Sequence, residues 1–117
     1  MNGILTIEEA RTIYPTCTIK ELAQIERGAV IGEDTYIGNH TKIHRESTIG
    51  YNTAIFDYAK IGFGCVVGSE ASVGKFSIML SGSVVGDLYH LGPNECVGIG
   101  ELRDVDEFLK RCCGFIK

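Results

Sequence analysis

A period of six residues runs through this sequence without a break. From Ile13 to Val97, every sixth residue is aliphatic or methionine, which makes fifteen positions in succession. Glycine directly follows this aliphatic residue in nine of the fifteen units. A helix of 3.6 residues per turn drifts out of phase with a strict period of six, and plain strand alternation does not explain it either. The fifth place of each unit is small in twelve successive units: Cys17, Ala23, Ala29, Thr35, Thr41, Ser47, Thr53, Ala59, Cys65, Ala71, Ser77 and Ser83.

These units predict an all-β fold, a left-handed parallel β-helix built from hexapeptide repeats. Each unit supplies a short strand and a bend, and three units close one triangular turn of 18 residues, so fifteen units predict five coils. The aliphatic residue is expected to fill the interior of the prism, and the small residue to point inward near a corner. Glycine is expected to relieve the steric limits on the backbone at the bend.

The repeat divides the chain into three expected segments. Residues 1–12 are an N-terminal cap, residues 13–102 the β-helix domain, and residues 103–117 a C-terminal helix and tail. Thr6 and Glu9 have the spacing of a capping box, which predicts a short helix over the first coil. From Arg103 to Cys113 the apolar residues fall on one helical stripe, and Gly114 follows as a stop signal. The small-residue rule fails just before this helix, at Tyr89, Glu95 and Glu101.

Composition and charge exclude several classes of protein. The net charge of −4 and pI of about 5.3 give no basic footprint for a nucleic acid. The N-terminal residues lack the basic start and apolar run of a secretion signal, and no apolar stretch approaches the ~20 residues of a membrane span. The five cysteines show no metal-binding pairing, and Cys112 and Cys113 are adjacent. We therefore expect a cytoplasmic protein with free thiols, bound to neither membrane nor nucleic acid.

Outward residues recur every 18 positions and form three rows. One row is apolar or nearly so, and we expect it to be the contact surface of a homotrimer: Val30, Thr48, Val66, Val84 and Leu102. Phe63, Leu80 and Ile99 are expected on the adjoining face. The alternative is that β-branched residues simply favour strands. The other two rows are Gln24, Lys42, Lys60, Ile78, Cys96 and Thr18, Tyr36, Ala54, Ser72, His90.

Residues 73–92, VGKFSIMLSGSVVGDLYHLG, resemble a segment of hexapeptide-repeat acyltransferases, most closely the sugar O- and N-acetyltransferases of the sialic-acid and UDP-amino-sugar type. The resemblance implies acetyl-CoA or another acyl-CoA as cosubstrate, bound in a groove between neighbouring subunits. In that family a histidine, often followed by a glutamate, is the general base. The corresponding positions here are Ser69 and Glu70, and a second family histidine corresponds to Ile78. By the same resemblance, the residues expected to contact the cofactor are Ile78, Gly82, Ser83, Gly86 and Asp87.

Three histidines remain as candidates for the base, because imidazole titrates near neutral pH. His90 is the preferred one, with Glu70 and Ser69 as further catalytic candidates, while His40 and His44 lie near another bend. No metal site is expected: separations of 4, 46 and 50 residues do not place these histidines at multiples of 18. The aromatic residues Tyr51, Phe56, Tyr58 and Phe76 either line a groove for acceptor or pantetheine, or cover outward faces of the strands.

Two functions therefore stay open. One is an acyl-CoA-dependent transferase that acts on a sugar or a small amine. The other is a catalytically inactive trimeric β-helix that binds a small molecule or serves as an assembly module, which the loss of histidine at Ser69 and Ile78 favours.

Overall fold

The computed structural model describes residues 3–103, which form one helix followed by fifteen two-residue strands. Helix α1 spans Ile7–Ile13. The strands fall into three parallel sheets of five, named here by their first strand. The β1 sheet holds β1 (Thr18–Ile19), β4 (Tyr36–Ile37), β7 (Ala54–Ile55), β10 (Ser72–Val73) and β13 (His90–Leu91). The β2 sheet holds β2 (Gln24–Ile25), β5 (Lys42–Ile43), β8 (Lys60–Ile61), β11 (Ile78–Met79) and β14 (Cys96–Val97). The β3 sheet holds β3 (Val30–Ile31), β6 (Thr48–Ile49), β9 (Val66–Val67), β12 (Val84–Val85) and β15 (Leu102–Arg103).

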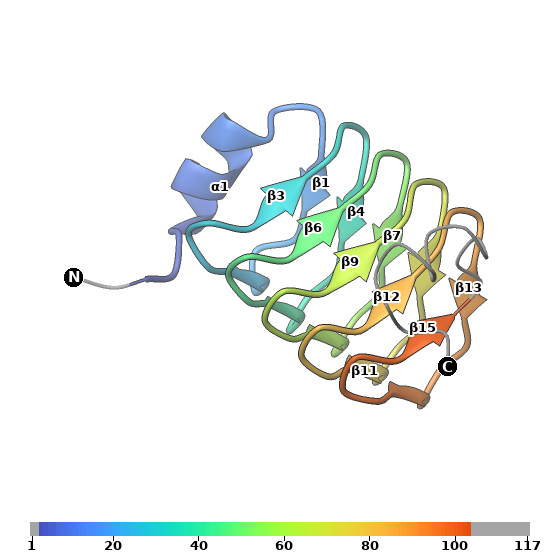
Figure 1. The fold of residues 1–117 in the computed structure, drawn as a ribbon. Coiled ribbons are helices and arrows are strands. Elements are labelled where there is room, and N and C mark those ends of the chain that lie inside the picture. The colour runs from blue at the N-terminus through green and yellow to red at the C-terminus, as the bar shows by residue number, and fades with distance from the viewer. Residues whose placement is uncertain (1–2, 104–117) are drawn as a thin grey trace.

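Consecutive strands lie on different sheets, and each strand pairs with the strand one coil further on. Thr18 is opposite Tyr36, Gln24 is opposite Lys42 and Val30 is opposite Thr48, so the register is 18 residues throughout. Figure 1 shows the five coils stacked in sequence order from the blue N-terminal end to the red C-terminal end. The predicted left-handed β-helix of five coils and the three outward rows are confirmed.

The second residue of each strand fills the interior, as the period of six predicts. Ile37, Ile55 and Ile61 have no exposed surface. Of the twelve small residues, ten are buried, and only Cys17 and Ala23 in the first coil are half-buried. Their hydroxyls also satisfy backbone groups: Thr53 Oγ1 donates to the carbonyl of Gly68 at 2.7 Å, in the next coil. Small polar residues thus occupy the corners without leaving a buried donor unpaired.

The start of the β-helix differs from the prediction at Ile13. This residue is the last of α1 and is 53% exposed, so the first inward aliphatic residue is Ile19 and the first strand begins at Thr18. The predicted capping box is confirmed: the Glu9 backbone N–H donates to Thr6 Oγ1 at 3.1 Å, and the Thr6 N–H donates to Glu9 Oε1 at 2.9 Å. The helix covers the first coil, where Arg11 donates to the carbonyl of Ile19 at 2.7 Å. The six-residue spacing of Ile13 is therefore a coincidence of the helix, where isoleucine is also tolerated.

The glycines that follow the aliphatic residue do not serve the purpose expected of them. Positive φ angles fall three residues after the aliphatic residue, from Gly28 to Gly100 at every sixth position, and nine of these thirteen residues are not glycine. The glycines after the strands are needed because neighbouring coils approach closely. A Cβ at Gly32 would lie 2.6 Å from the backbone of Gly50, and one at Gly68 would lie 2.4 Å from the nitrogen of Asp87.

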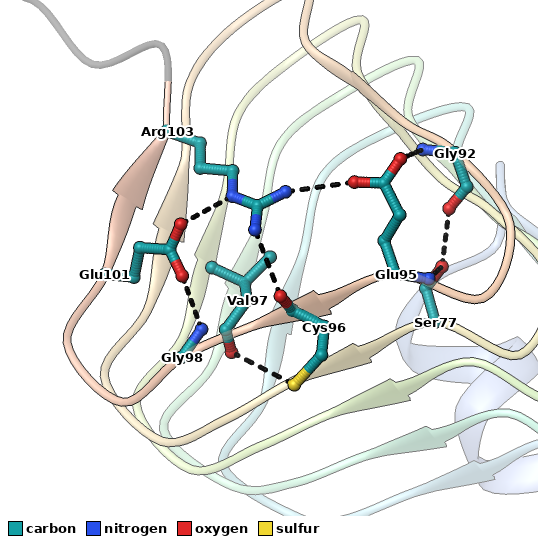
Figure 2. A network of polar contacts seen from close by, with 8 residues as sticks. All are labelled: Ser77, Gly92, Glu95, Cys96, Val97, Gly98, Glu101 and Arg103. Atoms are coloured by element: carbon teal, nitrogen blue, oxygen red, sulfur yellow. Dashed lines mark hydrogen bonds and ion pairs between the residues drawn. The ribbon is translucent and has the colours of Figure 1, made fainter.

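Polar side chains close the C-terminal end of the described chain. Arg103 donates to Glu101 Oε2 at 2.7 Å, to Glu95 Oε1 at 3.0 Å and to the carbonyl of Cys96 at 3.0 Å (Figure 2). Glu95 and Glu101 also accept from the backbone N–H of Gly92 and Gly98. The places where the small-residue rule fails are therefore the places where this network needs carboxylates.

The helix predicted from Arg103 to Cys113 is wrong at its first residue, because Arg103 belongs to β15. The rest of that prediction, including Cys112 and Cys113, lies outside the described residues. Among residues 3–103, no helix is long and apolar enough to cross a membrane.

Candidate functional site

The outer face of the β2 sheet carries a hollow next to a histidine. The residues directly after its strands stack at intervals of 18 as Glu26, His44, Gly62, Leu80 and Gly98. Gly62 has no side chain, so a space remains between His44 and Leu80. The resulting hollow of about 240 Å³, here called the apolar hollow, is lined by His44, Lys60, Gly62, Phe63, Ile78, Met79, Leu80 and Ser81.

His44 faces a carboxylate from the preceding coil. Its Nδ1 atom is buried, forms no hydrogen bond with residues of the described chain, and lies 3.5 Å from Glu26 Oε1. The same oxygen accepts from the backbone N–H of Arg45 at 2.8 Å. This backbone hydrogen bond, together with His44, lowers the pKa of Glu26, so the carboxylate stays charged at neutral pH. A carboxylate at Nδ1 orients an imidazole and stabilises its protonated form, which a general base requires.

Aromatic packing fixes the His44 ring on its other side. The ring stacks on Phe63 with centroids 4.7 Å apart and an angle of 30° between the planes. The Arg45 guanidinium lies 5.0 Å from the Phe63 centroid, within range of a cation–π interaction. His44 is therefore held between Glu26 and Phe63, beside an apolar hollow.

A second hollow of about 240 Å³ lies on the same sheet at its edge toward the β1 sheet. It is called the basic hollow and is lined by Leu22, Gln24, His40, Thr41, Lys42, Tyr58 and Lys60. Lys60 lines both hollows. The corner beside the basic hollow carries stacked rings, with centroids 4.7 Å apart for His40 and Tyr58 and 4.8 Å apart for Tyr58 and Phe76.

This aromatic ladder, His40–Tyr58–Phe76, occupies an unusual backbone conformation. All three residues have φ near 60°, where L-residues are disfavoured by roughly 1–2 kcal/mol each. Stacking of the rings, at roughly 0.5–1.5 kcal/mol per pair, offsets part of that cost. Tyr58 and Phe76 nevertheless remain 46% and 53% exposed, so the ladder covers little of the interior.

His90, the histidine preferred from the sequence, lies on a different face. It is exposed on β13 in the β1 sheet, and its Nδ1 atom is 2.8 Å from Ser72 Oγ in the preceding coil. The predicted neighbourhood of His90 and Ser72 is therefore present. The two residues form a hydrogen-bonded pair on the outward row of that sheet.

Ser69, Glu70 and Asp87 come together at the corner between the β3 and β1 sheets. With Tyr51 and Leu88 they line a hollow of about 190 Å³, called the corner hollow. The Ser69 N–H donates to Asp87 Oδ1 at 2.8 Å, and Ser69 Oγ accepts from the Tyr51 N–H at 3.2 Å. Ser69 thus bonds to the backbone of the neighbouring coil, which gives the hydroxyl a structural role.

The other residues expected to contact the cofactor are spread over the molecule. Ile78 lines the apolar hollow, and Gly82 occupies a corner between the β2 and β3 sheets with φ of 73°. Ser83 is fully buried in the interior, and Gly86 donates to the carbonyl of Arg103. Within one subunit these residues and Asp87 do not share a surface.

Sequence reasoning gave His44 too little weight. The available signals were its place directly after an inward aliphatic residue, where glycine is common, and a glutamate one coil earlier at Glu26. No group of three histidine, cysteine, aspartate or glutamate side chains that would hold a metal ion occurs within residues 3–103. Cys17, Cys65 and Cys96 are free thiols.

Comparison by sequence finds no relative: no protein-family model and no curated protein matches the chain. Comparison by structure does. A mutant of GDP-perosamine N-acetyltransferase from Caulobacter crescentus, in complex with CoA and GDP-perosamine, matches with a TM-score of 0.66 and 19% identity over 78% of this chain and 47% of that one. Serine acetyltransferase isoform 3 from Entamoeba histolytica matches with a TM-score of 0.58 and 15% identity over 86% of this chain and 38% of that one.

A third match is shorter and closer in length to this chain. A mutant of the N-acyltransferase AntD from Bacillus cereus, in complex with dTDP-4-amino-4,6-dideoxyglucose and coenzyme A, has a TM-score of 0.50 and 15% identity over 87% of this chain and 76% of that one. The chain spans less than half the length of the two acetyltransferases named first. At these identities the likeness establishes the fold: the chain has the left-handed β-helix fold that hexapeptide-repeat acyltransferases share.

Proposed function

We propose that the protein transfers an acyl group from acyl-CoA to an amine or hydroxyl of a small molecule. The observation that carries the proposal is the placement of His44, with Nδ1 directed at Glu26 and the ring beside an apolar hollow. Support for the cosubstrate comes from the solved relatives, whose structures contain CoA. The sugar nucleotides in those structures support a small polar acceptor in the same way.

The chemistry assigned to His44 is general base catalysis. With Nδ1 toward Glu26, Nε2 takes the proton from the acceptor as its nitrogen or oxygen attacks the thioester carbonyl. The new C–N or C–O bond forms, the C–S bond breaks, and the imidazolium returns the proton to the leaving thiolate. Glu26 stabilises the imidazolium between these two events. Positioned bases of this kind contribute roughly 10²–10⁴-fold in rate.

His90 is the alternative base, with Ser72 at its Nδ1 atom. The hydroxyl of Ser72 orients the ring but adds no negative charge, so it stabilises an imidazolium less than the carboxylate of Glu26 does. Glu70 and Ser69 enter this alternative through the corner hollow, in the region where the resemblance places the family's base.

The assembly that we propose is a homotrimer in contact through the outward row of the β3 sheet. Val30 and Val66 on this row are 58% and 39% exposed, and the glycines beside them add no polar side chain. Phe63 and Ile99, at the corner next to this sheet, are exposed as well. A groove between neighbouring subunits is where the resemblance places the acyl-CoA.

A second function has its own support. Ser69 and Ile78 occupy the places of the family's histidines, and Ser69 is engaged with backbone groups of the neighbouring coils. This arrangement favours a catalytically inactive β-helix that binds a ligand or organises an assembly.

Calorimetric titration with acetyl-CoA separates the two functions. The transferase requires binding in the micromolar range, and no binding at high micromolar concentration would contradict it. The three histidines then supply matched variants for an acetylation assay with a panel of amino sugars. His44→Ala should lower kcat by at least about 100-fold, whereas His40→Ala should retain activity. A loss confined to His90→Ala would assign the base to the β1 sheet instead.

A further inference from the structure

The basic hollow contains two cations that no protein group neutralises. Lys42 and Lys60 are opposite each other on adjacent strands β5 and β8, and both are exposed. Every ion pair within residues 3–103 involves other side chains. Like charges opposite each other in a sheet destabilise it, so this pairing is unfavourable without an anion.

The rest of the lining contains no carboxylate. Leu22, Gln24, His40, Thr41 and Tyr58 complete the hollow, in a chain whose net charge is −4. Glu26 and Asp57, the nearest acidic residues in sequence to this region, are engaged elsewhere: Glu26 with His44 and Arg45, and Asp57 with the N–H of Asn39 at 3.0 Å. The hollow is thus a positive site on an acidic protein.

The shape of the hollow restricts the ligand. A volume of about 240 Å³ is below the 300–1,000 Å³ that is usual for drug-sized ligands, which favours a molecule of monosaccharide size. One wall is the aromatic ladder, whose exposed Tyr58 offers an apolar edge and a hydroxyl. Gln24 and Thr41 add neutral polar groups. Ammonium groups bind phosphate oxygens through strong charge-assisted hydrogen bonds.

We propose that the basic hollow binds the phosphomonoester of a sugar-sized molecule, with the phosphate between Lys42 and Lys60 and the sugar against Tyr58. The site requires no turnover and goes beyond the acyl transfer proposed above. It is also distinct from the contacts expected for acyl-CoA, none of which lines this hollow.

Calorimetry at low ionic strength with glucose 1-phosphate tests the proposal, with glucose and inorganic phosphate as comparison ligands. We expect glucose 1-phosphate to bind more tightly than inorganic phosphate, and glucose not to bind. Lys42→Gln combined with Lys60→Gln should weaken binding at least tenfold, which is about 1.4 kcal/mol. Lys75→Gln is the matched control, because Lys75 is exposed on the same corner of the β-helix but does not line the hollow.

Two further measurements keep the result independent of folding. The double variant should unfold at the same temperature as the wild type or higher, because like-charge repulsion is removed. Tyr58→Asn, which suits a corner with positive φ, should weaken the sugar phosphate more than inorganic phosphate. The proposal is overturned by equal weakening in Lys75→Gln, by glucose 1-phosphate failing to bind at millimolar concentration, or by displacement of the bound ester by CoA.

Discussion

His44 and Glu26 lie one coil apart on the same face of the β-helix, with Nδ1 and Oε1 separated by 3.5 Å. The pairing depends on the 18-residue register, because Gln24 and Lys42 are opposite each other and the two following residues are therefore neighbours. Glu26→Gln should keep the hydrogen bond from the Arg45 N–H but remove the negative charge. We expect kcat for acyl transfer to fall at least tenfold with little change in KM, and the measurement is steady-state kinetics.

Glu26→Asp is the control for this prediction, since it keeps the charge and shortens the side chain. A rate between those of the wild type and Glu26→Gln would support an electrostatic role. An unchanged rate in Glu26→Gln would leave His44 without the support assigned to it.

A matched pair of isoleucines tests the register of the repeat. Ile37 is fully buried, whereas Ile13 follows the same period but is 53% exposed. Ile37→Ala should lower the free energy of unfolding by about 2–5 kcal/mol, because a cavity forms in the core. Ile13→Ala should change it by about 0.5 kcal/mol or less. Urea unfolding followed by circular dichroism measures both, and similar losses in the two variants would contradict the placement of Ile13.

The network around Arg103 should stabilise the last coil locally. Arg103→Leu removes contacts to Glu101, Glu95 and the Cys96 carbonyl and leaves two carboxylates close together. We expect faster hydrogen exchange in β14 and β15, with β2 and β5 unchanged. Arg27→Leu is the comparison at the other end, where Arg27 makes an exposed ion pair with Glu9 that contributes little. Equal effects of both variants on β14 would show that the network is not local.

Acid should destabilise the fold through three glutamates. The pKa of Glu9 is lowered by the Thr6 backbone and Arg27, that of Glu26 by the Arg45 backbone and His44, and that of Glu101 by Arg103 and the Gly98 backbone. Because the folded-state pKa values lie below the ordinary 4.5, this stabilisation is fully present above pH 4.5 and is lost as the pH falls through the lowered values. Thermal unfolding between about pH 6 and pH 2.5 should therefore show a falling Tm. The triple glutamine variant should show a shallower fall, and a parallel curve would contradict the assignment.

Charges placed on the β3 sheet should dissociate the proposed trimer. Val66→Asp combined with Val84→Asp puts two carboxylates in register on β9 and β12. Sedimentation velocity should then show a monomer. Thr18→Asp combined with Ala54→Asp adds the same charge to the β1 sheet and should leave the assembly intact. Dissociation by the second pair alone would move the contact to the β1 sheet.

Most of the fold was predictable because one physical constraint repeats. A prism of fixed width admits a large residue on each side and a small one near each corner, so the sequence from Ile19 onward follows the structure closely. Ile13 was misplaced because a helix residue happened to keep the period. The role of the glycines was misjudged since the period shows where they occur but not how closely the backbone of the next coil approaches.

The candidate site was predictable only in part. The 18-residue rows correctly place His90 beside Ser72, but the rows list outward residues of strands, and His44 stands one place later, after the strand. Its importance depends on two features that only the packed structure shows, the carboxylate of Glu26 directed at Nδ1 and the space left by Gly62. Ser83 shows the opposite case, a residue included by resemblance that lies inside the core.

The corners with positive φ at every sixth residue also limit how this chain can change in length. Insertion or deletion of 18 residues adds or removes one whole coil and keeps every later side chain on its sheet. A change of six residues also preserves the corners, yet it rotates everything downstream by one face, so that Ile78 would no longer lie below Lys60. Families of such proteins are therefore expected to differ by whole coils or by loops that leave the prism at a corner, where the backbone already turns outward.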